Sequence, residues 1–204
     1  MFAITEISKQ SVPTKAIEKS DQDDANEALV QAIAKGDRRA MQTLYTRHHV
    51  RIYRFILRLT NDASFAEDLV SEVFIGAWRQ AGGFKSKAQV STWLLAIARN
   101  KALSALGRRR DEQLDDEAAD LIADPAGDAE TMIEDQERSA IIRRCLSQLS
   151  RDHREVIDLV YYHEKTVEEV AHIIHVPAST VKTRMFYARK RMEKLLTASG
   201  CSLH

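Results

Sequence analysis

Basic and aromatic side chains share one face of the segment between residues 178 and 196. Six Lys or Arg stand there against a single acid, Glu193. The face opposite the apolar stripe carries Ser179, Lys182, Thr183, Phe186, Tyr187 and Lys190. Lys and Arg attract phosphate, and short polar or aromatic side chains can contact base edges and thymine methyls. We therefore expect this face to bind DNA; the alternative is a solvated basic helix that packs on a helical domain.

The surrounding sequence predicts two helices joined by a tight turn over residues 166–196. Thr166 and Glu169 form a capping box at the start of the first helix, and Pro177 breaks the pattern before the second. Apolar residues recur at helical spacing, namely Val167, Val170, Ala171 and Ile174 in the first helix and Val181, Met185, Ala188, Met192 and Leu195 in the second. This is the form of a helix-turn-helix, whose second helix enters the major groove of DNA.

The net charge of zero is an average over segments of opposite sign. Residues 111–137 contain twelve acids and no Lys or Arg, whereas basic residues gather in 99–110 and 182–194. The local distribution of charge, rather than its sum, sets the potential that DNA meets. A neutral chain is therefore compatible with DNA binding.

The composition favours an all-α fold of two small helical domains joined by a flexible acidic linker, with the helix-turn-helix in the second. Gly and Pro are few, at 7 and 3 of 204 residues, and helical periodicity dominates from about residue 27. We place a disordered N-terminal tail at 1–25, the first domain at 26–110, the acidic linker at 111–137, the second domain at 138–196 and a C-terminal tail at 197–204.

Several functional classes are disfavoured by what the sequence contains. Cys145 and Cys201 are isolated, which gives no metal framework and suits a reducing cytosol. No run of about 18 apolar residues is present, so we expect a cytoplasmic protein without membrane insertion. We find no nucleophile–base set and no phosphate loop, and expect neither an enzyme nor a cofactor. His48 and His49 are expected at the surface.

The first domain contains a strongly amphipathic helix and a basic loop. Ser64 and Glu67 form a second capping box before an apolar stripe of Leu69, Val70, Val73, Phe74 and Ala77. Gly82 and Gly83 are expected to end this helix. The loop 84–90 is basic and polar, and another helix begins at about residue 91.

Three segments together resemble the extracytoplasmic-function (ECF) sigma factors of bacterial RNA polymerase. They are AEDLVSEVFIGAWR (66–79), STWLLAIARNKALSALGRRR (91–110) and TVEEVAHIIHVPASTVKTRMFYARKRMEKLL (166–196). Their order, their separation and the acidic linker also match. The resemblance implies a region-two domain that binds polymerase and melts the minus-ten element, and a region-four domain that reads the minus-thirty-five element.

The resemblance also assigns roles to particular residues. Asp68, Glu72 and Arg79 lie on the helix that corresponds to the polymerase clamp-binding helix of the family. The minus-ten set comprises Phe84, Lys85, Lys87, Gln89, Thr92, Trp93, Arg99 and Asn100. Trp93 is either a wedge between bases or a core residue. The loop departs from the Arg-Gly-Asp-like version common in the family, which leaves its base preference open.

In the recognition helix the family positions for bases and backbone are Lys182, Thr183 and Phe186, and we expect Arg184, Arg189 and Lys190 to contact phosphate. Tyr187 stands where many members carry His or Arg, so the promoter preference is expected to differ there. Residues 111–137 either mimic nucleic acid in the polymerase channel or serve as a plain spacer.

The implied partners are core RNA polymerase, promoter DNA and an anti-sigma factor. The chain is expected to be a monomer when free, or to form a one-to-one complex with the anti-sigma factor. A stand-alone helix-turn-helix regulator that binds its operator as a dimer is the alternative function.

Overall fold

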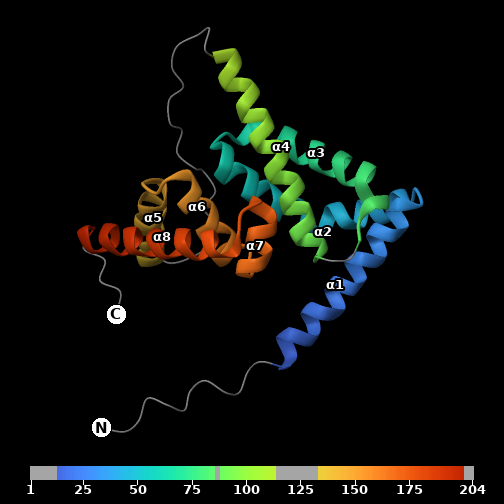
Figure 1. The fold of residues 1–204 in the computed structure, drawn as a ribbon, viewed down its shortest axis with the longest axis horizontal. Helices are drawn as coiled ribbons and strands as arrows, with labels where there is room; N and C mark the ends of the chain where they lie inside the picture. Colours follow the sequence, from blue (N-terminus) through green and yellow to red (C-terminus); the bar gives the residue numbers. More distant parts are fainter. Residues whose placement is uncertain (1–12, 86–87, 114–132, 200–204) are drawn as a thin grey trace.

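The computed structural model describes residues 13–85, 88–113 and 133–199, and all regular elements within them are helical (Figure 1). The predicted all-α fold is confirmed. The helices form an N-terminal unit and a C-terminal unit, and the intervening residues 114–132 lie outside the described ranges. None of the described helices is long and apolar enough to cross a lipid bilayer.

The N-terminal unit contains α1 (Pro13–Ala34), α2 (Arg38–Thr60), α3 (Ala63–Gln80), the short 3-10 helix η1 (Ala81–Gly83) and α4 (Val90–Gln113). Helix α2 begins where the Asp37 carboxylate accepts the N–H groups of Arg39 and Ala40, and it ends at Asn61 in the left-handed conformation. Apolar residues that face inward from α2, α3 and α4, such as Phe55, Leu69 and Leu94, are fully buried and form the core.

The C-terminal unit contains α5 (Ile133–Ser147), α6 (Arg151–Ile157), the π-helical turn η2 (Asp158–Tyr162), α7 (Val167–Ile174) and α8 (Ala178–Ala198). The predicted helix-turn-helix is α7 and α8. Both halves of its capping box are present, because Glu169 N–H donates to Thr166 Oγ1 at 3.2 Å and Thr166 N–H to Glu169 Oε2 at 3.0 Å. His175, with φ 55°, ends α7 just before Pro177.

Four element boundaries differ from those predicted. Helix α1 begins at Pro13, inside the segment 1–25 that was expected to be a disordered tail; Pro is well suited to a first helical position. Helix α3 is capped by Asp62, which accepts the Phe65 N–H at 2.9 Å, and not by Ser64. The longer helices α4 and α5 take residues 111–113 and 133–137 from the predicted linker.

The prediction that His48 lies at the surface was wrong. Its side chain is buried on α2, and Nε2 has no hydrogen-bond partner among the described residues. Burial lowers the pKa of His48 to about 4, and the nearby charges of Arg51, Arg47 and Lys165 act in the same direction. The imidazole is therefore neutral in the folded protein at neutral pH.

Acidification is expected to destabilise the N-terminal unit through His48. Between pH 6.5 and 4 the unfolded chain binds a proton that the folded chain does not, so the free energy of unfolding falls as the pH drops, by up to about 3 kcal/mol. Urea unfolding followed by tryptophan fluorescence measures this, because both tryptophans, Trp78 and Trp93, belong to this unit. His48→Gln should flatten the pH dependence, and His49→Gln should not; equal slopes for the two variants would contradict the assignment.

Candidate nucleic-acid interface

Helix α8 exposes the basic and aromatic face that the sequence predicts. Phe186 and Tyr187 are 55% and 54% exposed, and their rings meet edge to face at 5.4 Å. The other exposed members of the set are Ser179, Lys182, Thr183, Arg189 and Lys190. The opposite face is buried through Val181, Met185 and Ala188, so the core holds α8 with its polar face outward. This arrangement is able to present the face to a DNA groove.

Arg184 differs from the rest of the predicted recognition set. It is half-buried, and its guanidinium forms an ion pair with Asp152 of α6 at 2.6 Å. This contact ties α8 to α6 inside the C-terminal unit. In this structure Arg184 therefore helps to position α8, and its contact with phosphate stays a prediction.

The predicted minus-ten residues divide into those that stay within the N-terminal unit and those that contact the C-terminal unit. In the first group, Lys85 and Asn100 are exposed; Lys87 lies outside the described residues. Phe84 and Trp93 are half-buried, their ring centroids are 5.1 Å apart, and both pack against the core. The packing supports the core alternative for Trp93. The second group, Gln89, Thr92 and Arg99, makes contacts with the C-terminal unit.

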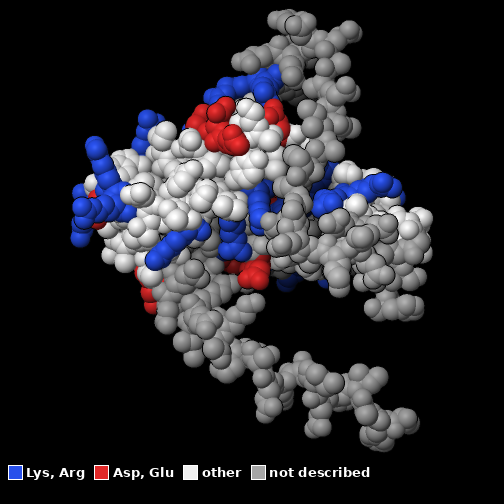
Figure 2. Space-filling view, turned by 180° about the vertical axis from the view of Figure 1, so that it is seen from behind, with Lys and Arg blue, Asp and Glu red and all other residues white. Residues whose placement is uncertain are grey.

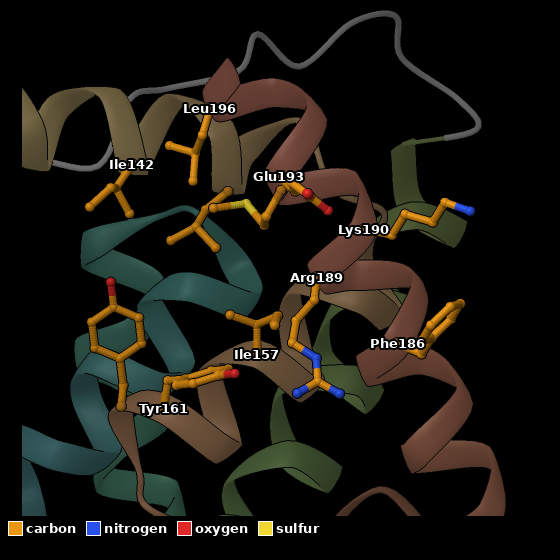
Figure 3. A pocket seen from close by; sticks show the side chains of 11 residues that line it. Ile142, Ile157, Tyr161, Phe186, Arg189, Lys190, Glu193 and Leu196 are labelled. Carbon is orange, nitrogen blue, oxygen red and sulfur yellow. The ribbon is translucent and has the colours of Figure 1, made fainter. Parts of the chain in front are cut away.

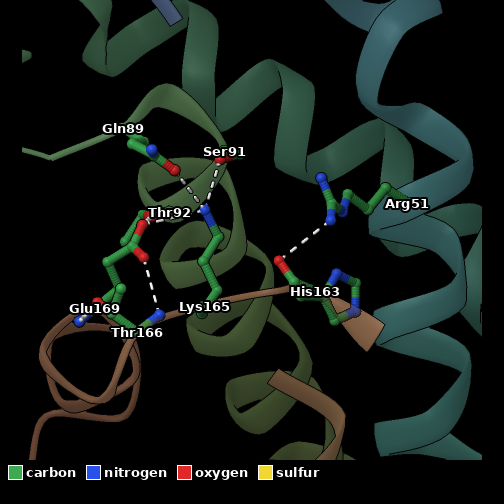
Figure 4. A network of polar contacts seen from close by, with 8 residues as sticks. All are labelled: Arg51, Gln89, Ser91, Thr92, His163, Lys165, Thr166 and Glu169. Atoms are coloured by element: carbon green, nitrogen blue, oxygen red, sulfur yellow. Dashed lines mark hydrogen bonds and ion pairs between the residues drawn. The ribbon is translucent and has the colours of Figure 1, made fainter. Parts of the chain in front are cut away.

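A network of polar contacts joins the start of α4 to the turn before α7 (Figure 4). The Lys165 ammonium is buried and donates to Gln89 Oε1 at 3.0 Å and to Ser91 Oγ at 2.7 Å. The Thr92 hydroxyl, which is fully buried, donates to the Glu169 carboxylate. Glu164 has a φ of 52°, and this turn of the chain brings Lys165 toward α4. Helix α7 consequently lies beside α4 (Figure 1).

Ion pairs extend this contact along α2 and α4. The Arg99 guanidinium binds Glu155 of α6 in bidentate fashion, with N–O distances of 2.7 and 3.3 Å. On α2, Arg58 pairs with Asp158 and also covers the Tyr162 ring. Five of the nine side chains in these pairs and in the network around Lys165 are more than nine-tenths buried. They are Ser91, Thr92, Glu155, Asp158 and Lys165.

The local environment favours the charged form of Glu169. Burial by itself raises the pKa of this carboxyl, but hydrogen bonds from Thr92 and the Thr166 N–H, with the Lys165 ammonium, outweigh burial and lower the pKa below its ordinary value. The carboxylate thus makes three contacts at once: the helix cap and Lys165 within its own unit, and the Thr92 hydroxyl of the other unit.

The predicted polymerase-binding residues form a stripe along the exposed side of α3. Asp68, Glu72 and Arg79 are exposed, and Glu72 pairs with Lys101 of α4 at 3.1 Å. Ile75 falls between them at helical spacing and is 51% exposed, although it was not among the predicted residues. Its helical spacing from Glu72 and Arg79, outside the buried stripe, was the available signal. The stripe therefore has an apolar centre and charged ends.

A groove of about 830 Å³ opens on the C-terminal unit between α5, η2 and α8 (Figure 3). Its lining residues are Ile142, Leu146, Ile157, Tyr161, Tyr162, Phe186, Arg189, Lys190, Met192, Glu193 and Leu196. In Figure 3, Ile142 and Tyr161 face α8 across this space. The floor is apolar, and the α8 side carries Arg189, Lys190 and Glu193, which leaves it with a net positive charge.

Charge is unevenly distributed on the face seen in Figure 2, which views the molecule from behind. Lys and Arg of the described residues lie there in separate patches, mostly with uncharged surface between them, and acidic side chains gather in a few places.

Comparisons with known proteins identify both units. The family model of sigma-70 region 2 matches residues 44–112, and that of sigma-70 region 4 matches residues 145–194. The ECF RNA polymerase sigma factor SigK of Mycobacterium ulcerans is 31% identical over 183 residues, which cover 87% of this chain and 96% of SigK. The chain belongs to the ECF sigma factors. Sigma factors are non-enzymatic initiation factors, and this ECF sigma factor is accordingly not an enzyme.

Two further proteins are similar to this ECF sigma factor. The RNA polymerase sigma-H factor of Pseudomonas aeruginosa is 32% identical over 181 residues, covering 84% of this chain and 93% of that protein. Among solved structures, the sigma factor RpoE of Bartonella quintana, in complex with the anti-sigma factor NepR, has a TM-score of 0.63 at 26% identity. That match covers 76% of this chain and 96% of RpoE.

Proposed function

We propose that this ECF sigma factor binds core RNA polymerase in the cytoplasm and directs transcription from promoters that it reads at two separate elements. The observation that carries the proposal is the outward-facing basic and aromatic surface of α8, held by the core of a unit that matches region 4. A second unit that matches region 2 supplies the other half of a promoter-reading protein. No cofactor enters this function.

The division of labour follows the two units. The region-four unit contacts the minus-thirty-five element through the exposed face of α8. The region-two unit contacts the minus-ten element through the loop 84–90 and the first turns of α4, and polymerase through the outer face of α3. The domain bounds 26–110 and 138–196 stay our proposal for these roles, with residues 111–137 between them, of which α4 and α5 include 111–113 and 133–137.

Reconstitution with core polymerase tests the function. The purified chain is expected to co-elute with core enzyme and to produce transcripts from a promoter selected out of a randomised library. Tight, dimeric binding to DNA without polymerase is the expected result for a stand-alone helix-turn-helix regulator. Failure to co-elute with core polymerase would refute the proposal and favour that alternative.

The groove on the region-four unit is the site that we assign to an amphipathic helix of an anti-sigma factor. Its apolar floor fits the apolar face of such a helix, and Arg189 and Lys190 fit acidic residues along its edge. The similar sigma factor RpoE is bound to an anti-sigma factor in its solved structure. Charge complementarity therefore predicts an acidic amphipathic partner helix.

Ile142→Asp is expected to weaken the binding of the anti-sigma factor at least tenfold, because docking would desolvate a carboxylate on an apolar floor. Ile142 is 39% exposed, so the variant should fold. Calorimetry with the separately produced anti-sigma factor measures the affinity, and Val50→Asp, at an exposed position of α2, is the control. Weakened binding of core polymerase with unchanged anti-sigma binding would assign the groove to polymerase, and self-association lost only in Ile142→Asp would assign it to a second copy.

A further inference from the structure

Part of the region-two surface that is proposed to bind the minus-ten element is already occupied by side chains of region four. One of its cationic donors, the Arg99 guanidinium, binds the Glu155 carboxylate, and its hydroxyl donor, Thr92, binds the Glu169 carboxylate. We infer that Glu155 and Glu169 compete with promoter DNA for these donors and thereby hold the free sigma factor closed. This inference rests on the minus-ten role proposed above.

The chemistry of the two contacts supports a competition with phosphate. A guanidinium binds a carboxylate and a phosphate in the same bidentate geometry, through parallel N–H···O bonds. The Arg99 and Glu155 side chains are only 15% and 2% exposed, so the pair has been removed from water and leaves no room for a phosphate. A DNA strand can reach Arg99 only after α6 has moved away.

The contact between Thr92 and Glu169 can break while the structure of region four stays intact. Glu169 retains its bonds to the Thr166 N–H and to Lys165, both within region four, when it loses Thr92. The helix cap of α7 therefore persists after opening. Lys165 also leaves Gln89, another residue of the minus-ten set, when the units part.

The contact between the units covers residues of only one of the two surfaces proposed to bind DNA. The α8 face remains exposed, whereas Gln89, Thr92 and Arg99 are covered. The closed form can therefore meet the minus-thirty-five element, whereas the minus-ten contacts of these three residues are blocked. The apparent affinity for a ligand that binds only the open form is the intrinsic affinity multiplied by the fraction of molecules that are open. Loosening the contact increases that fraction and therefore raises the apparent affinity.

The test compares carboxylate-to-amide variants in the full chain. Glu155→Gln combined with Glu169→Gln removes both charges, and Gln at position 169 still completes a capping box. Glu67→Gln combined with Glu168→Gln is the control, because it changes the net charge equally at two exposed positions. Small-angle scattering of the free protein measures opening, and fluorescence anisotropy measures the affinity for a labelled single-stranded oligonucleotide that carries the selected minus-ten sequence.

We expect the Glu155 and Glu169 variant to increase the radius of gyration and to bind the oligonucleotide about 3 to 10 times more tightly, with the control unchanged. An unchanged radius would overturn the inference, since the carboxylates would then not hold the units together. An increased radius with unchanged affinity would overturn the competition alone. If neither variant nor the unmodified chain binds the oligonucleotide while the radius increases, the proposed minus-ten role fails and the closing contact remains.

Discussion

Replacement of Ile75 by Asp on α3 is expected to lower the affinity for core RNA polymerase at least tenfold. Ile75 lies at the centre of the stripe formed with Asp68, Glu72 and Arg79, and about half of its surface is exposed. Central apolar anchors surrounded by polar residues carry much of the free energy of protein interfaces, and a tenfold loss corresponds to about 1.4 kcal/mol. An aspartate there would instead be desolvated on docking.

The affinity is measured by titration of the labelled sigma factor with core polymerase. Val50→Asp is a matched control, because Val50 is 47% exposed on α2 and lies outside the stripe. Thermal unfolding should change little for Ile75→Asp, since the side chain leaves a surface position and Asp costs only a few tenths of a kcal/mol in a helix. Unaltered affinity for core polymerase in Ile75→Asp would show that the outer face of α3 does not bind the enzyme.

The helix-turn-helix could be predicted from sequence because its determinants are local. The capping box of Thr166 and Glu169, the break at Pro177 and the apolar spacing of α8 all act within a few residues, and the structure contains each of them. Local signals were also ambiguous where two caps were close together. Asp62 and Ser64 both suit an N-cap, and the structure uses Asp62.

The contact between the two units could not be predicted, for a physical reason. Its partners are far apart in the chain: Thr92 and Glu169 are separated by 77 residues, and Arg99 and Glu155 by 56. Periodicity carries no information about such pairs. The residue types are also shared by two roles, because an Arg that suits a phosphate suits a carboxylate equally well. Thr92 and Arg99 are predicted to bind the minus-ten element because their hydrogen-bond donors suit DNA. The same donors suit the carboxylates of Glu169 and Glu155 in region four.

The prediction that His48 lies at the surface was wrong for a related reason. A histidine within a run of polar and basic residues has the composition of a surface position, and only the packing of the unit decides its burial. The structure places His48 inside the helix face that contains Leu44 and Ile52, at spacings of four residues. Here the helical periodicity of α2 was the informative signal, and the polarity of the side chain was not.

The combined change of Lys182→Ala and Thr183→Ala is expected to reduce promoter-dependent transcription by one to two orders of magnitude. Both residues are exposed near the N-terminal end of α8, the part of a recognition helix that reaches base edges. Loss of a base contact typically costs about 1–3 kcal/mol, and loss of a phosphate contact weakens binding to all sequences alike. Affinity for core polymerase should remain unchanged, because the stripe on α3 that we propose to bind polymerase belongs to the other unit.

The same helix offers a matched control for this variant. Lys194 and Thr197 are also exposed, and Thr197 Oγ1 donates to Glu193 O at 2.9 Å much as Thr183 Oγ1 donates to Ser179 O at 3.0 Å. Lys194→Ala with Thr197→Ala thus removes the same charge and the same kind of hydrogen bond at the far end of α8. An equal loss of transcription in both variants would mean that α8 attracts DNA by charge alone, whereas a loss confined to Lys182 and Thr183 assigns promoter reading to the start of the helix.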